Sequence, residues 1–507
     1  MKTETRPSAL QPAPHPTQTR SFTTIALIEL WERFGYYGMQ ALIIYFMVER
    51  LGFEDSRANL VWGAAAALIY VSPAIGGWIG DKVLGTKRCM YLGAMILTVG
   101  YALMAVPTDS TWFLFGSLGV VVVGNGLFKP NTANLVRKIY EGDDSKIDSA
   151  FTIYYMAVNV GSTVSMLATP WIKDYVNTTY GGGLGWHAAF AVCSVGLVIG
   201  LLNLMLMRRT IDHIGSIPDT RPLDTGKLML VLAGGVVVVG LATVILQYQS
   251  IARAFVYLAG IVVLGIFTHL IRKSEPSERA GLIAALVLTL QTVFFFIFYQ
   301  QMSTSLSLFA LRNVDLDFTV LGRHLWTWSP AQFQALNAIW IMVLSPFLAW
   351  IYTAAGRARR DLSIAGKFAL GFAVVAAGFF SYGAAGSFAV NGLTSSWIMI
   401  AGYGLYSLGE LLVSGLGLAM IARYVPARMG GFMMGAYFVA VGISQYLGGV
   451  VANLASIPKN LTDPLQTLPI YTSLFNKLGI AAIVCTLIAL AALPLMRRLT
   501  ATHQSHQ

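Results

Sequence analysis

The chain has 507 residues, of which 56% are hydrophobic and 11% are charged, and its mean hydropathy is +0.65. This composition excludes a soluble globular protein and is typical of a polytopic membrane protein, whose solvent is the lipid bilayer. The formal net charge of +11 would also fit a nucleic-acid-binding protein, but the basic residues lie in short loops between apolar stretches, so we expect no nucleic-acid partner.

Apolar stretches of about 20 residues, enough to cross the hydrocarbon core, recur along almost the whole chain. Residues 1–21 are rich in Pro, Thr and Gln, lack the apolar core of a signal peptide, and are expected to form a disordered cytoplasmic tail. The range 22–208 follows as a six-helix bundle, with spans predicted at 22–48, 58–80, 88–106, 112–136, 150–172 and 187–207.

A linker at 209–280 carries two further apolar segments, near 228–247 and 253–271, between polar stretches. The range 281–497 is expected to form a second six-helix bundle and 498–507 a cytoplasmic tail, with spans predicted at 281–310, 331–353, 364–388, 396–421, 430–453 and 471–496. The sequence therefore predicts an all-α polytopic membrane protein with 14 transmembrane helices, arranged as six, two and six.

Basic residues gather in alternate loops, for example Lys82, Lys87 and Arg88, and then Arg208 and Arg209. The loops between them, such as MVERLGFEDSR, mix both signs. By the positive-inside rule the basic loops and both termini are cytoplasmic, and we expect a monomer in the inner (plasma) membrane. The three cysteines are far apart in the sequence, a spacing that indicates neither a disulfide framework nor a metal site.

The first apolar stretch opens with ELWERFGYYG, which places charges where lipid is expected. Glu29, Glu32, Arg33 and Tyr36 follow helical spacing and share one face, so Glu29 can pair with Arg33 directly. An ionisable side chain inside a bilayer usually faces the bundle interior and has a partner. The alternative is a structural ion pair that only holds helices together.

Two further ionisable residues lie within predicted spans, Lys129 in GNGLFKPN and Glu410 in SLGELLVSG, and Asn337 adds an amide. Lys129 is the obvious second cation for the two carboxylates of the first helix, although a lysine that reaches to the membrane surface remains an alternative. One acid, basic residues and amides in a bundle interior make a site for a zwitterion.

These residues resemble a known family, the proton-coupled oligopeptide transporters of the major facilitator superfamily. ELWERFGYYG is similar to the family's ExxERFxYYG signature, and the resemblance continues in order through YVSPAIGGWIGDKVLGTKR, GNGLFKPN, FTIYYMAVNVGS, GWHAAF, KFALG, GELLVSG and GGFMMG. It covers roughly residues 22–496, and the two mid-chain helices resemble those of bacterial members.

The resemblance implies the major facilitator fold and the import of di- and tripeptides by alternating access at a site between the two bundles. In the family, Glu410 with Asn159 and Asn337 would hold the peptide amine, and Arg33 with Lys129 would hold its carboxylate. The remaining substrate-binding positions that we carry over or infer are Tyr36, Tyr70, Tyr155, Gln300, Ser414 and Tyr437.

Proton coupling is assigned to Glu29, Glu32, Arg33 and Lys129. A buried carboxylate that loses its cationic partner binds a proton more readily, so peptide binding at Arg33 and protonation of a neighbouring carboxylate favour each other. Protons are the coupling ion, and no metal or organic cofactor is expected.

The chain departs from the family at one pair of positions. A basic residue common in the first helix is Gln40 here, and the acid that many members carry next to the glutamines of FYQQMSTSL is absent. Because both signs are missing together, no buried charge is left alone, and we expect the pair to be replaced by neutral groups around Gln300.

Three alternative functions are weighed against this hypothesis. The same scaffold could carry another small solute, such as nitrate or an amino-acid derivative, or the protein could be a receptor that transports nothing. An intramembrane enzyme would need a nucleophile with a base or a metal cluster, and His187 stands alone near a helix end, so we predict that the protein is not an enzyme.

Overall fold

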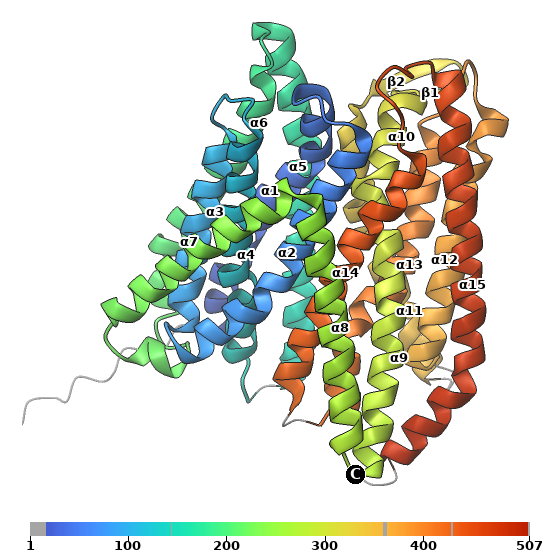
Figure 1. Cartoon of the computed structure of the whole chain (residues 1–507). Coiled ribbons are helices and arrows are strands. Elements are labelled where there is room, and N and C mark those ends of the chain that lie inside the picture. The colour runs from blue at the N-terminus through green and yellow to red at the C-terminus, as the bar shows by residue number, and fades with distance from the viewer. Residues whose placement is uncertain (1–16, 143, 358–361, 427–428, 505–507) are drawn as a thin grey trace, which may run out of the picture.

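The computed structural model describes residues 17–142, 144–357, 362–426 and 429–504. Long helices run side by side through the molecule and a short β-hairpin lies at one end (Figure 1). Of the tails expected at 1–21 and 498–507, residues 1–16 and 505–507 lie outside the described residues. Residues 18–21 are not disordered as expected but form the start of the first helix, and residues 498–504 continue the last one. The architecture is that of an all-α membrane protein with a major facilitator fold.

The helices follow the predicted order of six, two and six. The first bundle consists of α1 (Gln18–Tyr45), α2 (Asp55–Lys82), α3 (Thr86–Met104), α4 (Thr111–Ile139), α5 (Asp144–Tyr180) and α6 (Leu184–Leu206). The inserted helices are α7 (Thr225–Gln247) and α8 (Gln249–Lys273). The second bundle consists of α9 (Pro276–Tyr299), α10 (Ser305–Asn313), α11 (Ala335–Arg357), α12 (Ile364–Gly383), α13 (Trp397–Tyr424), α14 (Gly430–Ala452) and α15 (Pro464–Gln504).

Twelve helical segments of the described part are long and apolar enough to cross a membrane. Two long helices, α1 and α3, complete the fourteen. α1 carries Glu29, Glu32 and Arg33 at its centre, and α3 begins with Thr86 followed by two basic residues, so both are less apolar than the others. α1, which lipid would accommodate least readily, is thus the helix that holds the charged cluster.

Glycines bring α4 close to its neighbours and so fix the position of Lys129. A Cβ atom added to Gly76 of α2 would lie 1.8 Å from the carbonyl oxygen of Gly126, and one added to Gly93 of α3 would lie 2.6 Å from the backbone nitrogen of Phe128. Only glycine permits such backbone contact between helices. The glycines of GNGLFKPN therefore serve packing.

The span predicted as one helix at 281–310 is interrupted. A 3₁₀ turn at Gln300–Ser303 separates α9 from α10. The hydroxyl of Thr304 donates to the carbonyl oxygen of Gln300 at 2.8 Å, and that of Ser307 to the carbonyl oxygen of Met302 at 2.8 Å. Hydroxyl side chains that bond to backbone carbonyls can bend a helix, and these two bonds lie at the break between α9 and α10.

A β-hairpin that the sequence analysis did not predict follows α10. Strands β1 (Asp317–Val320) and β2 (Arg323–Thr327) pair antiparallel, and the residues between them, Leu321 and Gly322, both have positive φ, 49° and 77°. Such a two-residue turn matches the twist of a hairpin. We call the end of the molecule that carries these strands the hairpin end (Figure 1).

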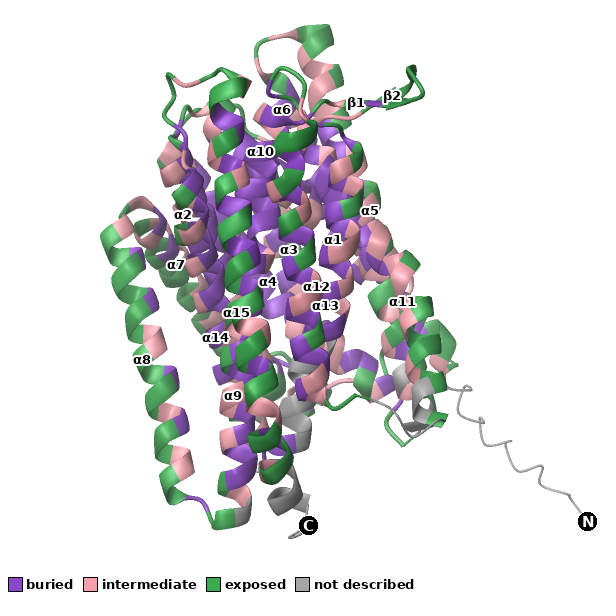
Figure 2. Cartoon of the chain, turned by 90° about the vertical axis from the view of Figure 1, so that its right-hand side faces the viewer, coloured by how far each residue is buried: buried purple, intermediate pink, exposed green. Residues whose placement is uncertain are grey.

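The inserted helices each pack on a different bundle. α7 contacts α4, where a Cβ added to Gly119 would lie 3.0 Å from the carbonyl oxygen of Val239, whereas α8 contacts α14 and α9. Figure 2 shows α8 at the edge of the molecule with mostly exposed and half-buried residues, while buried residues concentrate inside the bundles. The insertion therefore lies outside the core and spans from one bundle to the other.

Polar contacts join the two bundles at the hairpin end. Arg312 of α10 holds the carboxylate of Asp55 of α2 with both terminal nitrogens, at 2.6 and 2.7 Å, and also donates to the Tyr471 hydroxyl at 2.7 Å. The backbone N–H of Ile457 donates to the same carboxylate at 3.2 Å. Further contacts link Asn59 with Asn453, Trp62 with Ser303, and Tyr45 with Ser307. These contacts hold the hairpin end closed.

We predict that Asp55→Asn opens the hairpin end. The change leaves Arg312, 19% exposed at its side chain, without an anion, and weakens closure by roughly 2 kcal/mol, less than for a fully buried pair. Spin labels on the exposed positions Tyr180 and Leu321, one in each bundle, should report a larger population at long distance.

The matched control is Arg50→Gln, which breaks the ion pair with Asp109 at 2.9 Å. Both partners of that pair belong to the first bundle and are well exposed, so the distance distribution should not change. A double variant that exchanges Asp55 and Arg312 should restore part of the closure. An Asp55→Asn distribution identical to that of the unmodified protein would contradict this role.

Candidate functional site

The charged residues of α1 form one buried cluster. Nε of Arg33 lies 2.5 Å from Oε2 of Glu32 and 3.5 Å from Oε1 of Glu29, and all three side chains are at most 4% exposed. The interaction between Glu29 and Arg33 that helical spacing predicts is therefore present, and the neighbour Glu32 makes the shorter contact. Oε1 of Glu32 has no hydrogen-bond partner among the described residues.

α4 completes this cluster from the other side. The hydroxyl of Thr132 donates to Oε2 of Glu29 at 3.1 Å and lies 3.1 Å from the hydroxyl of Tyr154. A terminal nitrogen of Arg33 donates to Oδ1 of Asn125 at 3.4 Å. The guanidinium is thus shared between two carboxylates and an amide.

Aromatic rings cover the cations. The Arg33 guanidinium carbon lies 5.1 Å from the centre of the Tyr36 ring, and the Lys129 ammonium lies 5.3 Å from the centre of the Tyr70 ring. Cation–π contact stabilises such charges away from water. Arg33 and Lys129, with the rings above them, are called the basic pole.

Glu410 of α13 is the acid of the second bundle. Its side chain is buried, and Oε2 accepts a hydrogen bond of 2.7 Å from the amide of Asn337 on α11, which also donates to Ser407 at 3.0 Å. No ion pair reaches Glu410 from the described residues. Glu410 and Asn337 are called the acid pole.

Tyrosines connect the two poles. The Arg33 guanidinium carbon lies 6.0 Å from the centre of the Tyr37 ring, and the ring of Tyr299 on α9 lies 6.3 Å from that of Tyr406, one turn before Glu410. Tyr70 and Tyr299 line the same pocket. The predicted pole residues from four helices of two bundles therefore surround one region of the protein.

Other predicted positions are less closely tied to the poles. Asn159 donates to the carbonyl oxygen of Tyr155, one turn earlier in its own helix, at 2.8 Å, and Tyr155 is 41% exposed. Ser414 lies one turn beyond Glu410, and Tyr437 is buried on α14 beside Phe438. No contact described for Ser414 or Tyr437 links them to Glu410 or Arg33.

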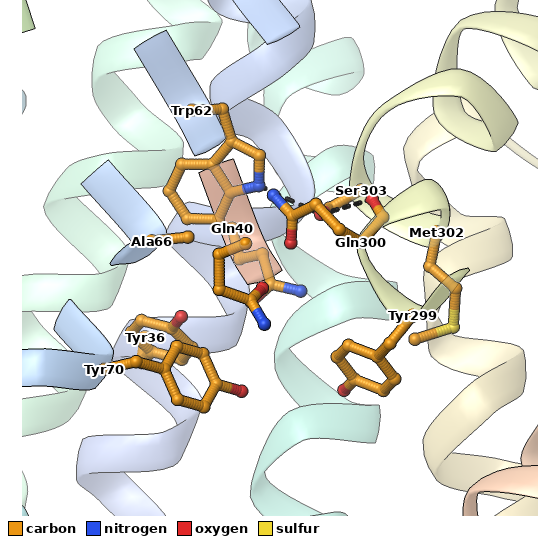
Figure 3. Close-up of a pocket in the computed structure, with 10 residues that line it drawn as sticks. Tyr36, Gln40, Trp62, Ala66, Tyr70, Tyr299, Gln300, Met302 and Ser303 are labelled. Carbon is orange, nitrogen blue, oxygen red and sulfur yellow. Dashed lines mark hydrogen bonds between the residues drawn. The ribbon is translucent and has the colours of Figure 1, made fainter. Parts of the chain in front are cut away.

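Gln40 and Gln300, the two positions at which the usual charges are missing, line one small pocket (Figure 3). The pocket lies at the junction of α1, α2, α14 and the break after α9, and Figure 3 shows Tyr36, Tyr70 and Tyr299 along its lower side. The two glutamines belong to different bundles. The uncharged residues expected in place of the usual ion pair thus lie in the same pocket.

The sequence analysis did not identify Thr132, Tyr154 and Asn125 as site residues. Thr132 and Asn125 lie three and four residues from Lys129, so helical spacing from Lys129 could have indicated both. In FTIYY, Tyr154 directly precedes Tyr155, the tyrosine that the resemblance indicated. The contact of Tyr154 with Thr132 distinguishes the two tyrosines. The described residues contain no group of three metal-ligating side chains.

Comparisons with known proteins agree with this geometry. A family model described as the POT family matches residues 87–469. The dipeptide and tripeptide permease B of Aliivibrio fischeri (strain MJ11) is 40% identical over 489 residues, which is 96% of each chain. The dipeptide and tripeptide permease A of Cronobacter turicensis is 42% identical over 487 residues, 95% of this chain and 94% of that one.

Solved structures are similar over the whole molecule. A structure described as a bacterial homologue of the human drug peptide transporters PepT1 and PepT2 is 73% identical, with a TM-score of 0.88, and covers 95% of this chain and 100% of that one. A structure described as tetrameric PepTSo2 is 72% identical, with a TM-score of 0.88 and coverage of 95% and 99%. A peptide transporter of the same family in complex with sulfate is 29% identical, with a TM-score of 0.80 and coverage of 97% of both chains. The chain belongs to the POT family of bacterial peptide transporters.

Proposed function

We propose that this protein is a proton-driven symporter that imports di- and tripeptides across the bacterial inner membrane by alternating access. The observation that carries the proposal is the pair of buried poles, basic on the first bundle and acidic on the second, joined by tyrosines. A zwitterion with an amine at one end and a carboxylate at the other matches this arrangement. The relatives that are named dipeptide and tripeptide permeases support the same substrates.

In this proposal the peptide amine binds Glu410, which Asn337 orients, and the carboxylate binds Arg33 and Lys129. These contacts recognise the two groups that all short peptides share, so the side chains remain free to vary. Tyr36 and Tyr70, together with Tyr155, Asn159, Ser414 and Tyr437, would form the walls around those side chains. Nitrate or another anion would gain nothing from Glu410, which opposes that alternative.

Charge balance supports coupling to one proton. The candidate site holds three carboxylates, Glu29, Glu32 and Glu410, against two cations, Arg33 and Lys129, so its sum is −1 when all are ionised. A zwitterionic peptide adds no net charge, and one proton brings the sum to zero. Since net charge in a membrane interior is unfavourable, the neutral state with one proton and one peptide is the one suited to cross.

Glu32 is the proposed carrier of that proton. One of its oxygens has no partner among the described residues, and the other depends on Arg33. When a peptide carboxylate takes over the guanidinium, Glu32 loses the contact that stabilises its charge and binds a proton. Glu29 keeps its bond from Thr132 and is the second candidate.

The site of one chain is complete, so we propose the single chain as the transport unit. The related structures described as tetrameric make a tetramer of such units the alternative assembly. The mass of the protein in detergent distinguishes the two. Uptake of a labelled dipeptide into proteoliposomes, with and without an inward proton gradient, tests the function itself, and uptake that ignores the gradient would contradict it.

Lys129→Ala and Glu410→Ala should each abolish dipeptide uptake, because each removes one end of the zwitterion site, while an exposed substitution, Asp224→Ala, should not. Competition assays then separate the poles. A free dipeptide should compete with labelled substrate far better than its N-acetylated form in the unmodified protein. Equal competition by the two would mean that Glu410 does not recognise the amine.

Glu32→Gln should eliminate gradient-driven accumulation, since the amide cannot carry a proton, while counterflow, which needs no net proton movement, survives at least in part. Gln300→Ala is the comparison variant: it should weaken transport without changing its dependence on the gradient. If Glu32→Gln still concentrated dipeptide when protons are driven inward, the cluster of α1 would be structural.

The proposed orientation places the hairpin end outside the cytoplasm and both termini inside it. In a variant without its native cysteines, a membrane-impermeant thiol reagent added to whole cells should modify Leu321→Cys, at the exposed tip of the hairpin, but not Arg221→Cys, in the linker before α7. The opposite labelling pattern would invert the topology.

A further inference from the structure

The pocket that holds Gln40 and Gln300 is built without charge. Its ten lining residues include three glutamines, three tyrosines, Trp62 and Ser303, and none of them is an acid or a base. They come from both bundles, so the pocket exists only while the hairpin end is closed. Its volume is about 10 Å³, close to the smallest space that holds one water molecule.

Two amide groups in this pocket lack acceptors. Nε2 of Gln300 and Nε2 of Gln445 have no hydrogen-bond partner among the described residues, although the two side chains are only 3% and 1% exposed. A buried donor without an acceptor is unfavourable by about 1–3 kcal/mol. Both donors therefore require an acceptor that enters the pocket.

The neighbouring hydroxyl of Ser303 is already engaged with two other groups. The indole N–H of Trp62 donates to the hydroxyl of Ser303 at 2.9 Å, and that hydroxyl points to the carbonyl oxygen of Gln300 at 3.4 Å. The start of the Gln300 side chain is held against Gly448, where an added Cβ would lie 2.4 Å from the Cβ of Gln300. Close packing thus limits how far the Gln300 amide can move from the pocket.

The pocket shares a wall with the proposed peptide site. Tyr36 and Tyr70, which cover Arg33 and Lys129, also line the pocket. A peptide held between the two poles therefore has the pocket beside it, toward the hairpin end.

We propose that this pocket binds a single uncharged oxygen atom, which is a water in the empty transporter and a side-chain hydroxyl of a bound peptide. A hydroxyl oxygen accepts two hydrogen bonds, one from each of Gln300 and Gln445, and its own proton can be donated to the amide oxygen of Gln40. A carboxylate or ammonium would be desolvated there without a counter-charge. The inference rests on the proposed function and adds a preference for peptides that carry serine or threonine.

The test compares two nearly equal shapes, threonine and valine, which differ by a hydroxyl in place of a methyl group. Ala-Thr and Ala-Val, and the reversed pair Thr-Ala and Val-Ala, compete with labelled Ala-Ala for uptake into proteoliposomes. In the unmodified protein the threonine peptide of at least one pair should compete about fivefold better, the effect of one net hydrogen bond. Equal competition within both pairs overturns the inference, whereas a failure to take up Ala-Ala overturns the proposed function instead.

Two variants locate the preference. Gln300→Leu and Gln445→Leu keep the size of the side chain and remove the donors, so the ratio between threonine and valine peptides should fall to one, whatever happens to the absolute rate. Gln291→Leu is the matched control, since Gln291 is also a buried glutamine but lines a separate groove on α9 and α15. That variant should keep the ratio, and a loss of the ratio there would overturn the assignment to this pocket.

A structural experiment distinguishes the two sources of the oxygen. At a resolution that shows waters, the peptide-free protein should have one water between the two amides, and the complex with the preferred threonine peptide should have the hydroxyl in its place. A water that stays there beside the bound peptide would overturn the substrate contact.

Discussion

The cost of holding charge away from water is the constraint on which the rest of the structure depends. An ionisable group at the centre of a bilayer is unfavourable by roughly 2.5–3.5 kcal/mol on insertion scales. The first bundle meets this cost with mutual pairing, because Arg33 lies between Glu29 and Glu32 and aromatic rings cover the cations. Glu410 has only the amide of Asn337, so the second bundle keeps an acid whose charge still needs a cation.

Contacts elsewhere in the molecule position these charged groups and the interface between the bundles. Glycine contacts fix α4 against α2 and α3 and hold Lys129 beside Tyr70. The ion pair between Asp55 and Arg312 closes the hairpin end at the interface between the bundles. Closure there depends on this pair, while the pocket around Gln40 and Gln300 carries no charge at all. The charged contact between the bundles thus lies at the hairpin end, apart from the uncharged pocket.

Much of the fold could be predicted because a helix that crosses a bilayer needs a long apolar stretch of sequence. Apolar stretches of spanning length and the spacing of Glu29, Glu32 and Arg33 are local patterns, and they appear in the structure as helices and as one helix face. The pairing of Asn337 with Glu410 could be expected only in outline, since the two residues are 73 positions apart.

Other features depend on contacts that no local pattern contains. The break at Gln300–Ser303 is accompanied by hydrogen bonds from hydroxyl groups to the backbone, and the apolar stretch before it gives no sign of an interruption. The hairpin depends on left-handed backbone at Leu321, a residue that rarely adopts it. Asp55 and Arg312 looked like ordinary loop charges, and only the docking of two bundles makes them partners.

The inserted helices have a mechanical consequence. α7 packs mainly on α4 of the first bundle and α8 mainly on α14 and α9 of the second, and the two helices follow one another at Tyr248. Any rocking of one bundle against the other must therefore tilt or bend this pair within the surrounding lipid. We therefore expect the insertion to couple movement of the bundles to the surrounding lipid, so that the turnover rate depends on bilayer thickness as well as on the substrate.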